Sequence, residues 1–144
     1  MEEVYYKDDF LILFYNRNTK TARAVWDGFL SGETLRHATT QCLRLLEEEQ
    51  PLNWLADNRK MKAIRQKDQE WVQSVMIPRL VASPLRKMAT LVSEDIFNKM
   101  AVENLYRRSS DLIKFDHQYF KDEKSAAQWL EEDFILKANG PDLL

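Results

Sequence analysis

Short apolar runs alternate with longer segments of helical periodicity along most of this chain. Leu52–Ala56 and Lys87–Val92 are nearly continuous apolar runs, which is typical of strands that helices cover on both faces. Glu33–Glu49 places apolar residues three and four positions apart, as on one face of a helix. Strands that alternate with helices of this length require right-handed crossovers, so the chain is predicted to form an α/β domain with a mostly parallel sheet.

The start of the chain indicates a different pairing. Phe10–Tyr15 and Thr21–Trp26 are both strand-like and are separated by turn-forming residues, so we expect an antiparallel hairpin at one edge of the sheet. The hydrophobic pattern then predicts about four helices in all and one further strand. Beyond Glu33–Glu49, a helix is expected over Lys67–Val81, and Pro78 inside it predicts a kink or restart near Ile77. The remaining elements are a helix capped by Ser93, a strand over Ile113–Phe120 and a helix over Glu123–Glu132 capped by Asp122.

Composition limits the class of protein. The chain has 144 residues, of which 44% are hydrophobic and 31% are charged, so we expect one globular domain over residues 1–132 and a loosely held tail over residues 133–144. A net charge of −2 without a basic stripe argues against nucleic-acid binding. The apolar runs are too short for a membrane span or a signal peptide, so a cytoplasmic location is expected. Cys42 is the single cysteine and is predicted to be a buried hydrophobe.

The abrupt end of the apolar run at Asp57-Asn58-Arg59-Lys60 is the candidate functional site. Ligands and partners of open α/β sheets gather where parallel strands end, and an arginine there can hold a carboxylate or a phosphate through two hydrogen bonds. The alternative is a structural ion pair, Asp57 with Arg59 or Asp68 with Arg59, that fixes the loop. The sequence leaves both readings open.

Catalytic patterns are weak elsewhere. His37 and His117 lack a second ligand at metal-binding spacing apart from Asp116, and a surface or edge role is expected for His117. No nucleophile elbow or glycine-rich loop is present, so we expect no catalytic residue, no metal site and no cofactor. The helix after Ser93 is expected to bury an apolar face that consists of Ile96, Phe97, Met100, Ala101 and Leu105.

Three segments and the order of the elements carry a resemblance over residues 10–130. They are Trp54-Leu55-Ala56-Asp57 followed by Asn58-Arg59, then Asp68-Gln69-Glu70-Trp71 at the start of a helix, and Lys87–Val92 followed by Ser93. With these segments the chain resembles the STAS and CRAL-TRIO-like superfamily of small bacterial domains, which includes the anti-sigma-factor antagonists. It looks most like an uncharacterised branch of stand-alone domains.

The resemblance implies where a site would lie. In the antagonists an aspartate ends the strand, as Asp57 does here, and a phosphorylatable serine follows at the start of the next helix. This chain has Arg65-Gln66-Lys67-Asp68 at that place, without a hydroxyl group, which argues against a phosphoswitch. Asp68 could imitate a phosphoserine, although a carboxylate carries about one charge against roughly two. Asp68 and Ser93, which open the following helices, therefore join residues 57 to 60 as candidate site residues.

The leading functional hypothesis is a non-enzymatic cytoplasmic module that binds a protein partner, as the resemblance implies. The alternative, implied by the CRAL-TRIO likeness, is a domain that binds a small molecule or a lipid in an apolar pocket between sheet and helices. An enzyme of unknown reaction ranks last. The aromatic edge hairpin, which ends at Trp26, is a candidate surface for a homodimer because unpaired strand edges need to be covered.

Overall fold

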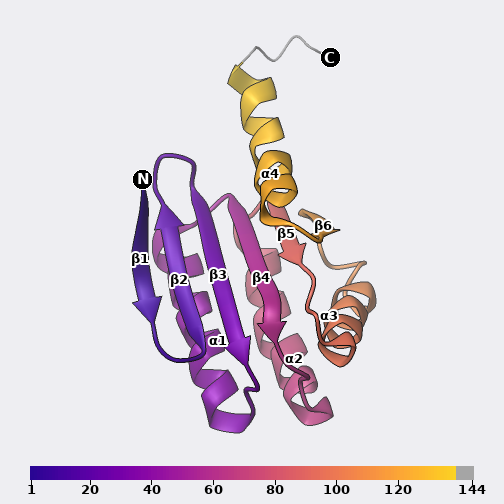
Figure 1. Cartoon of the computed structure of the whole chain (residues 1–144). Helices are drawn as coiled ribbons and strands as arrows, with labels where there is room; N and C mark the ends of the chain where they lie inside the picture. The colour runs from indigo at the N-terminus through magenta and orange to yellow at the C-terminus, as the bar shows by residue number, and fades with distance from the viewer. Residues whose placement is uncertain (139–144) are drawn as a thin grey trace.

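The computed structural model describes the backbone of residues 1–138 and the side chains of residues 1–132. The structure contains six strands and four helices (Figure 1). They are β1 (Glu2–Lys7), β2 (Leu11–Asn16), β3 (Thr21–Gly28), α1 (Gly32–Glu49), β4 (Asn53–Met61), α2 (Gln66–Ala82), β5 (Lys87–Leu91), α3 (Ile96–Arg108), β6 (Asp116–Phe120) and α4 (Glu123–Ala138). From β2 onward the elements follow one another in the order that the sequence predicts, and β1 precedes them.

The strands form one sheet in which the order in space is the order in the chain. β1, β2 and β3 pair antiparallel, whereas β3, β4, β5 and β6 pair parallel. The predicted α/β class, the parallel sheet and the N-terminal hairpin are therefore confirmed. β1 is an additional edge strand, and the Asp8 carboxylate closes its turn into β2 by accepting hydrogen bonds from the backbone N–H groups of Phe10 and Leu11.

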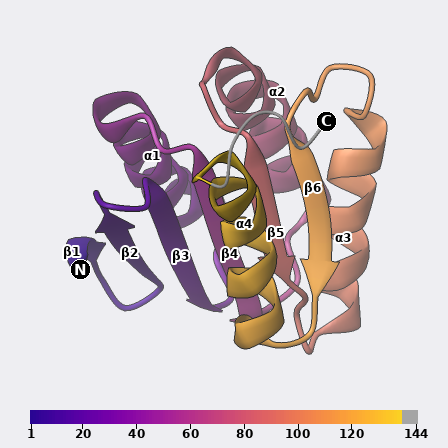
Figure 2. The same cartoon turned by 90° about the horizontal axis from the view of Figure 1, so that it is seen from above.

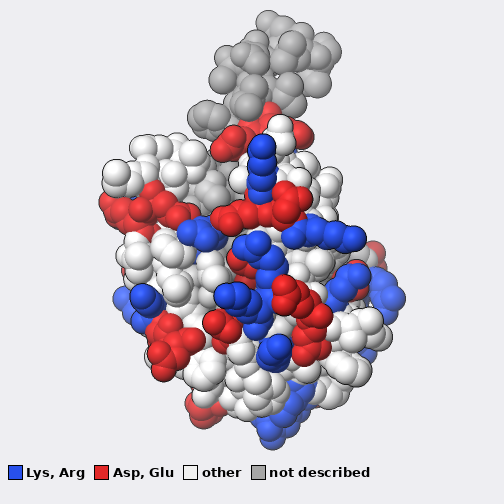
Figure 3. Space-filling model, in the orientation of Figure 1, with Lys and Arg blue, Asp and Glu red and all other residues white. Residues whose placement is uncertain are grey.

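The sequential strand order divides the helices between the two faces. Right-handed crossovers between neighbouring parallel strands all lie on one face, so α1, α2 and α3 cover the same side of the sheet. α4 packs on the opposite side, against β5 and its neighbours (Figures 1 and 2). The part of this second face that lies over β1 to β3 carries no helix, and Figure 3 shows acidic and basic side chains mixed across it.

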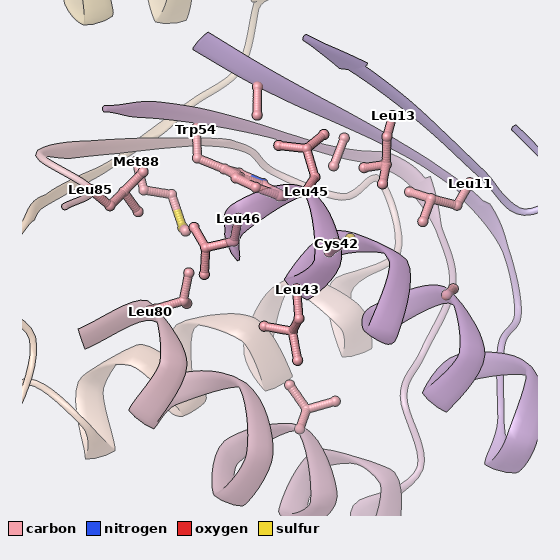
Figure 4. Packing of buried hydrophobic residues seen from close by; sticks show 14 of the residues in the cluster. Leu11, Leu13, Cys42, Leu43, Leu45, Leu46, Trp54, Leu80, Leu85 and Met88 are labelled. Atoms are coloured by element: carbon pink, nitrogen blue, oxygen red, sulfur yellow. The ribbon is translucent and has the colours of Figure 1, made fainter. Parts of the chain in front are cut away.

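The main core lies between the sheet and the three helices on the first face. Leu11 and Leu13 of β2, Trp54 of β4 and Met88 of β5 meet leucines of α1 and α2 there (Figure 4). Cys42 is part of this core, as predicted, and burial raises the pKa of its thiol well above the usual range. No described helix is both long enough and apolar enough to span a bilayer.

Several element boundaries differ from those predicted. α2 continues through Pro78 without a restart, and β6 begins at Asp116 rather than at Ile113. α3 begins later than expected because Asp95, rather than Ser93, accepts the capping hydrogen bond, from the N–H of Phe97. α4 is capped by Asp122, as predicted, and its backbone runs on to Ala138 instead of ending at Glu132. The remainder of the predicted tail lies outside the described residues.

Candidate functional site

The segment over residues 57–60 is part of a strand and not the turn that the sequence predicts. β4 continues to Met61 because β3 is long enough to keep pairing with it, Asp27 with Lys60 and Gly28 with Met61. Asp57 and Asn58 are buried, Arg59 is half-buried and only Lys60 is exposed. The four residues therefore do not form an exposed loop beyond the end of the strand.

The register between β3 and β4 shifts at this point. Two steps along β3, from Val25 to Asp27, face three steps along β4, from Asp57 to Lys60. At this irregularity the four candidate residues, 57 to 60, lie on different faces of the sheet. Asp57 and Arg59 lie on the face that carries α4, together with Lys60 at the same hollow, whereas Asn58 faces the core beneath the other helices.

Asp57 and Arg59 form the structural pair that the sequence left as an alternative. The guanidinium donates to both carboxylate oxygens, from Nε to Oδ1 at 2.9 Å and from Nη2 to Oδ2 at 2.8 Å. Burial opposes ionisation of Asp57, but the hydrogen bonds from Arg59 outweigh it and keep the pKa of the carboxyl below its usual value. The second alternative, an Asp68 to Arg59 pair, is not what the structure contains.

The pair belongs to a chain of charges that joins α4 to the sheet. Glu123, in the first turn of α4, lies 3.6 Å from Arg59 and 3.7 Å from Arg23. Arg23 in turn makes two hydrogen bonds with Glu2 of the edge strand and stacks over the ring of Phe14. A hollow of about 540 Å³ borders this chain, but both of its arginines are already bound to carboxylates of the protein. The arrangement explains stability better than ligand capture.

Asp68 and Ser93 have structural partners. The Asp68 carboxylate accepts hydrogen bonds from the N–H of Gly32 at 3.2 and 3.3 Å and from Arg65 at 2.8 Å, so it caps α1 from a neighbouring helix. Ser31, at the capping position of α1 itself, makes no side-chain cap. The Ser93 hydroxyl donates to the carbonyl of Met61 and accepts from the N–H of Asp95, which fixes the loop between β5 and α3.

α3 carries an exposed apolar ridge, formed by Ile96, Phe97 and Met100, that the sequence did not predict. Ile96, Phe97 and Met100 are 62%, 70% and 58% exposed, whereas they were expected to be buried. Ala101 is buried, as expected, and Asn98 and Val102 complete the buried side of the helix.

The rotation of α3 follows from a polar contact. The Asn98 amide donates to the carbonyl of Lys62 at 2.9 Å and so holds that side of the helix against the end of β4. The sequence contains one indication of this exposure. Apolar residues occupy the first, second, fifth, sixth and tenth positions of the helix, and together they cover a wider arc than one buried face.

A groove of about 550 Å³ runs beside this ridge. Phe97 and Met100 line one side of it, and Ile64 and Gln69, from the connection after β4 and from α2, line the other. Glu103 and Arg107 supply a polar border. The groove and the ridge together form a surface with an apolar centre and a charged edge.

The core beneath the helices contains a cavity of about 100 Å³. Its walls come from the sheet and from α1, α2 and α3, and they are almost entirely apolar. The polar exceptions are Thr39, Asn58, Thr90 and the hydroxyl of Tyr106. Trp26, at the end of the hairpin, also lines it.

Both histidine side chains contact neighbouring side chains of the protein. His117 lies on the edge strand β6, as predicted, but its ring is packed between Tyr106 and Tyr119 and bonds the Thr90 hydroxyl at 2.8 Å. Burial lowers its pKa to about 4. His37 is within 3.2 Å of the Tyr6 hydroxyl. Within residues 1–132, no three side chains among His, Cys, Asp and Glu gather closely enough to hold a metal ion.

The fold can be compared with known proteins. No protein-family model matches the chain, and no curated protein matches it either. Among solved structures, it is similar to an uncharacterised protein of the DUF3478 family from Shewanella loihica PV-4, which has a SpoIIAA-like fold. The two chains are 16% identical, with a TM-score of 0.53 over 90% of this chain and 92% of that one. The fold of this chain is therefore SpoIIAA-like, as its resemblance to anti-sigma-factor antagonists predicts.

Proposed function

We propose that this chain is a non-enzymatic, cytoplasmic protein-interaction module that binds a partner protein through the ridge Ile96, Phe97 and Met100. The observation that carries the proposal is the exposure of all three side chains on one side of α3. Scattered apolar residues are normal at a protein surface, but a contiguous patch with a polar border is characteristic of interaction sites.

The groove beside the ridge supports this role. An aromatic anchor such as Phe97 contributes most to binding when a partner covers it completely and excludes water around it. Burying a side chain of this size contributes roughly 1.5–3 kcal/mol. Phe97 and Met100 together therefore supply enough apolar surface to anchor a partner, and Glu103 and Arg107 at the border supply charges that orient it.

The environment of Asp68 argues against a phosphorylation switch at α2. A residue that imitates phosphoserine must present its charge to a partner, but the Asp68 carboxylate is 2% exposed and is occupied by Gly32 and Arg65. Together with the absence of a hydroxyl group over residues 65 to 68, this favours a partner surface that is constitutive rather than switched by phosphate.

Site-specific photocrosslinking tests the proposal. A benzophenone amino acid replaces Phe97 in cells of the source organism, and the same amino acid replaces the exposed Asn18 in the β2–β3 turn as the matched control. We expect a discrete adduct at position 97 that is absent at position 18 and that is lost when Met100→Ser is added. The adduct is identified by mass spectrometry, which separates a different protein from a second copy of this chain joined at the edge hairpin or at α3.

The ridge must also be dispensable for folding. Phe97→Ser is expected to change the melting temperature by no more than a few degrees, because the ring is already in water. Equal crosslinking at positions 97 and 18, or collapse of the fold in Phe97→Ser, would contradict the proposal.

A further inference from the structure

We infer that the cavity beneath the helices is a binding site for a small, mainly apolar molecule with one hydrogen-bonding group, and that Asn58 recognises that group. This site is independent of the ridge on α3 and of the partner proposed for it.

Asn58 lacks a partner within the described part of the chain. The residue is 6% exposed and lines the cavity, yet its side-chain amide makes no hydrogen bond to any described residue. The amide atoms of Asn58 retain some accessible surface, since the fully buried side-chain atom without a partner among the described residues is Oδ1 of Asn98. A polar group that faces an interior cavity in this way is normally satisfied by water or by a ligand. The two N–H donors and the carbonyl acceptor of Asn58 are thus available to a molecule in the cavity.

Thr39 provides a second polar group from another wall. It belongs to α1, is buried, and its hydroxyl makes no hydrogen bond within the described residues. Its neighbour Thr40 donates to the carbonyl of Arg36, which shows that α1 permits such a bond one position later. Two other hydroxyl groups of the lining have partners: that of Thr90 is bound to His117, and that of Tyr106 donates to the sulfur of Met88. Asn58 and Thr39 therefore supply the polar groups that are available in a mainly apolar space.

Space at this position follows from small residues in the sheet. Ala56 precedes Asn58 by two residues on the same face of β4 and lines the cavity, and Ala22 and Ala24 of β3 are buried in the same core. Side chains this short leave room between the sheet and the helices. Met76 and Met88 complete the lining, and methionine side chains adjust readily to an occupant.

The volume limits the size of the ligand. A cavity of about 100 Å³ exceeds what one water needs, roughly 10–15 Å³, and is smaller than typical ligand sites of roughly 300–1,000 Å³. Ordered water needs two to four polar partners per molecule, and these walls offer few. A single small ring or a short branched chain with one hydroxyl or amide fits both the volume and the walls, whereas a long lipid chain does not.

The cavity approaches the surface between α2 and α3. Its partly exposed lining residues Ile64, Met76 and Leu105 come from the connection after β4, from α2 and from α3. Ile64 also lines the groove beside the ridge. A small molecule can therefore enter where these two helices meet without passing through the sheet.

Phenol and toluene are suitable probes because they differ only in a hydroxyl and a methyl group. Titration of the ¹⁵N-labelled chain with each probe, followed by amide chemical shifts, is expected to show saturable binding of both around the cavity. We expect phenol to bind about fivefold to tenfold more tightly than toluene, as one hydrogen bond to a buried amide implies.

Three variants test whether the probes bind in the cavity and whether Asn58 causes the preference for phenol. Asn58→Leu is expected to fold, to retain toluene binding and to lose the preference for phenol. Ala56→Leu fills the cavity and abolishes the binding of both probes. Asn53→Leu, the same change on the same strand away from the cavity, is the control and leaves both affinities unchanged. Absence of saturable binding of either probe, or a phenol preference that persists in Asn58→Leu, overturns the inference. Should Asn58→Leu fail to fold, Asn58→Ala, which removes the amide without adding bulk, provides the same comparison.

Discussion

His117 makes the stability of this fold depend on pH in a direction that the structure determines. The ring is held by Thr90 of β5, Tyr106 of α3 and Tyr119 of β6, and each of these neighbours is uncharged at neutral pH. Burial without a counter-charge lowers the pKa of His117 from 6.5 to about 4. The folded chain therefore keeps the ring neutral over a range in which the unfolded chain takes up a proton.

The magnitude follows from linkage. Below the unfolded pKa, the unfolded state binds more protons than the folded state, so the free energy of unfolding falls as the pH falls. For pKa values of 6.5 and about 4, acidification from pH 7 to pH 5 removes about 2 kcal/mol of stability, and the full loss near pH 4 is about 3 kcal/mol. Urea denaturation at a series of pH values measures this slope directly.

One histidine variant separates His117 from other titrating groups. His117→Gln is expected to be less stable at pH 7 but to lose about 2 kcal/mol less than the parent chain between pH 7 and pH 5. The other titrating groups are present in both chains and contribute equally to them. If His117→Gln and the parent chain have the same slope, the reasoning from burial is refuted.

Two further predictions concern the predicted site residues. Arg59→Ala leaves the buried Asp57 carboxylate without its partner and is expected to reduce the free energy of unfolding by about 1–3 kcal/mol, while Lys60→Ala changes it little; urea denaturation compares the two, and equal effects would count against the pair. Asp68→Ala removes the cap of α1 and is expected to reduce that free energy by about 0.5–2 kcal/mol, whereas Ser31→Ala, which removes a hydroxyl that makes no cap, is nearly neutral. A larger loss for Ser31→Ala in the same assay would show that the cap is local.

The sequence predicted most of the fold because hydrophobic periodicity reports burial locally. The hairpin, the helix over Glu33–Glu49 and the buried strands β4 and β5 each have a pattern of their own, and the structure contains all of them. The end of β4 was misplaced because polar residues normally stop a buried strand. Here β3 continues to pair with it, and the ion pair with Arg59 makes a buried Asp57 acceptable.

The roles of the site residues depended on contacts between distant parts of the chain. Asp68 caps a helix that begins 36 residues earlier, and Asn98 binds the carbonyl of Lys62 at the same separation. Periodicity contains no information about either contact. It therefore could not reveal that Asp68 is structural, nor that α3 is rotated so that Ile96, Phe97 and Met100 face outward.

The strand order explains why the cavity and the exposed apolar ridge both lie on the side of the sheet that α1, α2 and α3 cover. A crevice at the ends of parallel strands forms where the strand order reverses and neighbouring helices pass to opposite faces. In this sheet the order never reverses, so α1, α2 and α3 stay together on one face, and the hollow beside Asp57 lies on the opposite face. The three helices instead enclose the cavity at Asn58 and turn the apolar side of α3 toward solvent. Both proposed recognition sites, the outer surface of α3 for a partner protein and the cavity beneath the helices for a small molecule, lie on this helical side of the sheet.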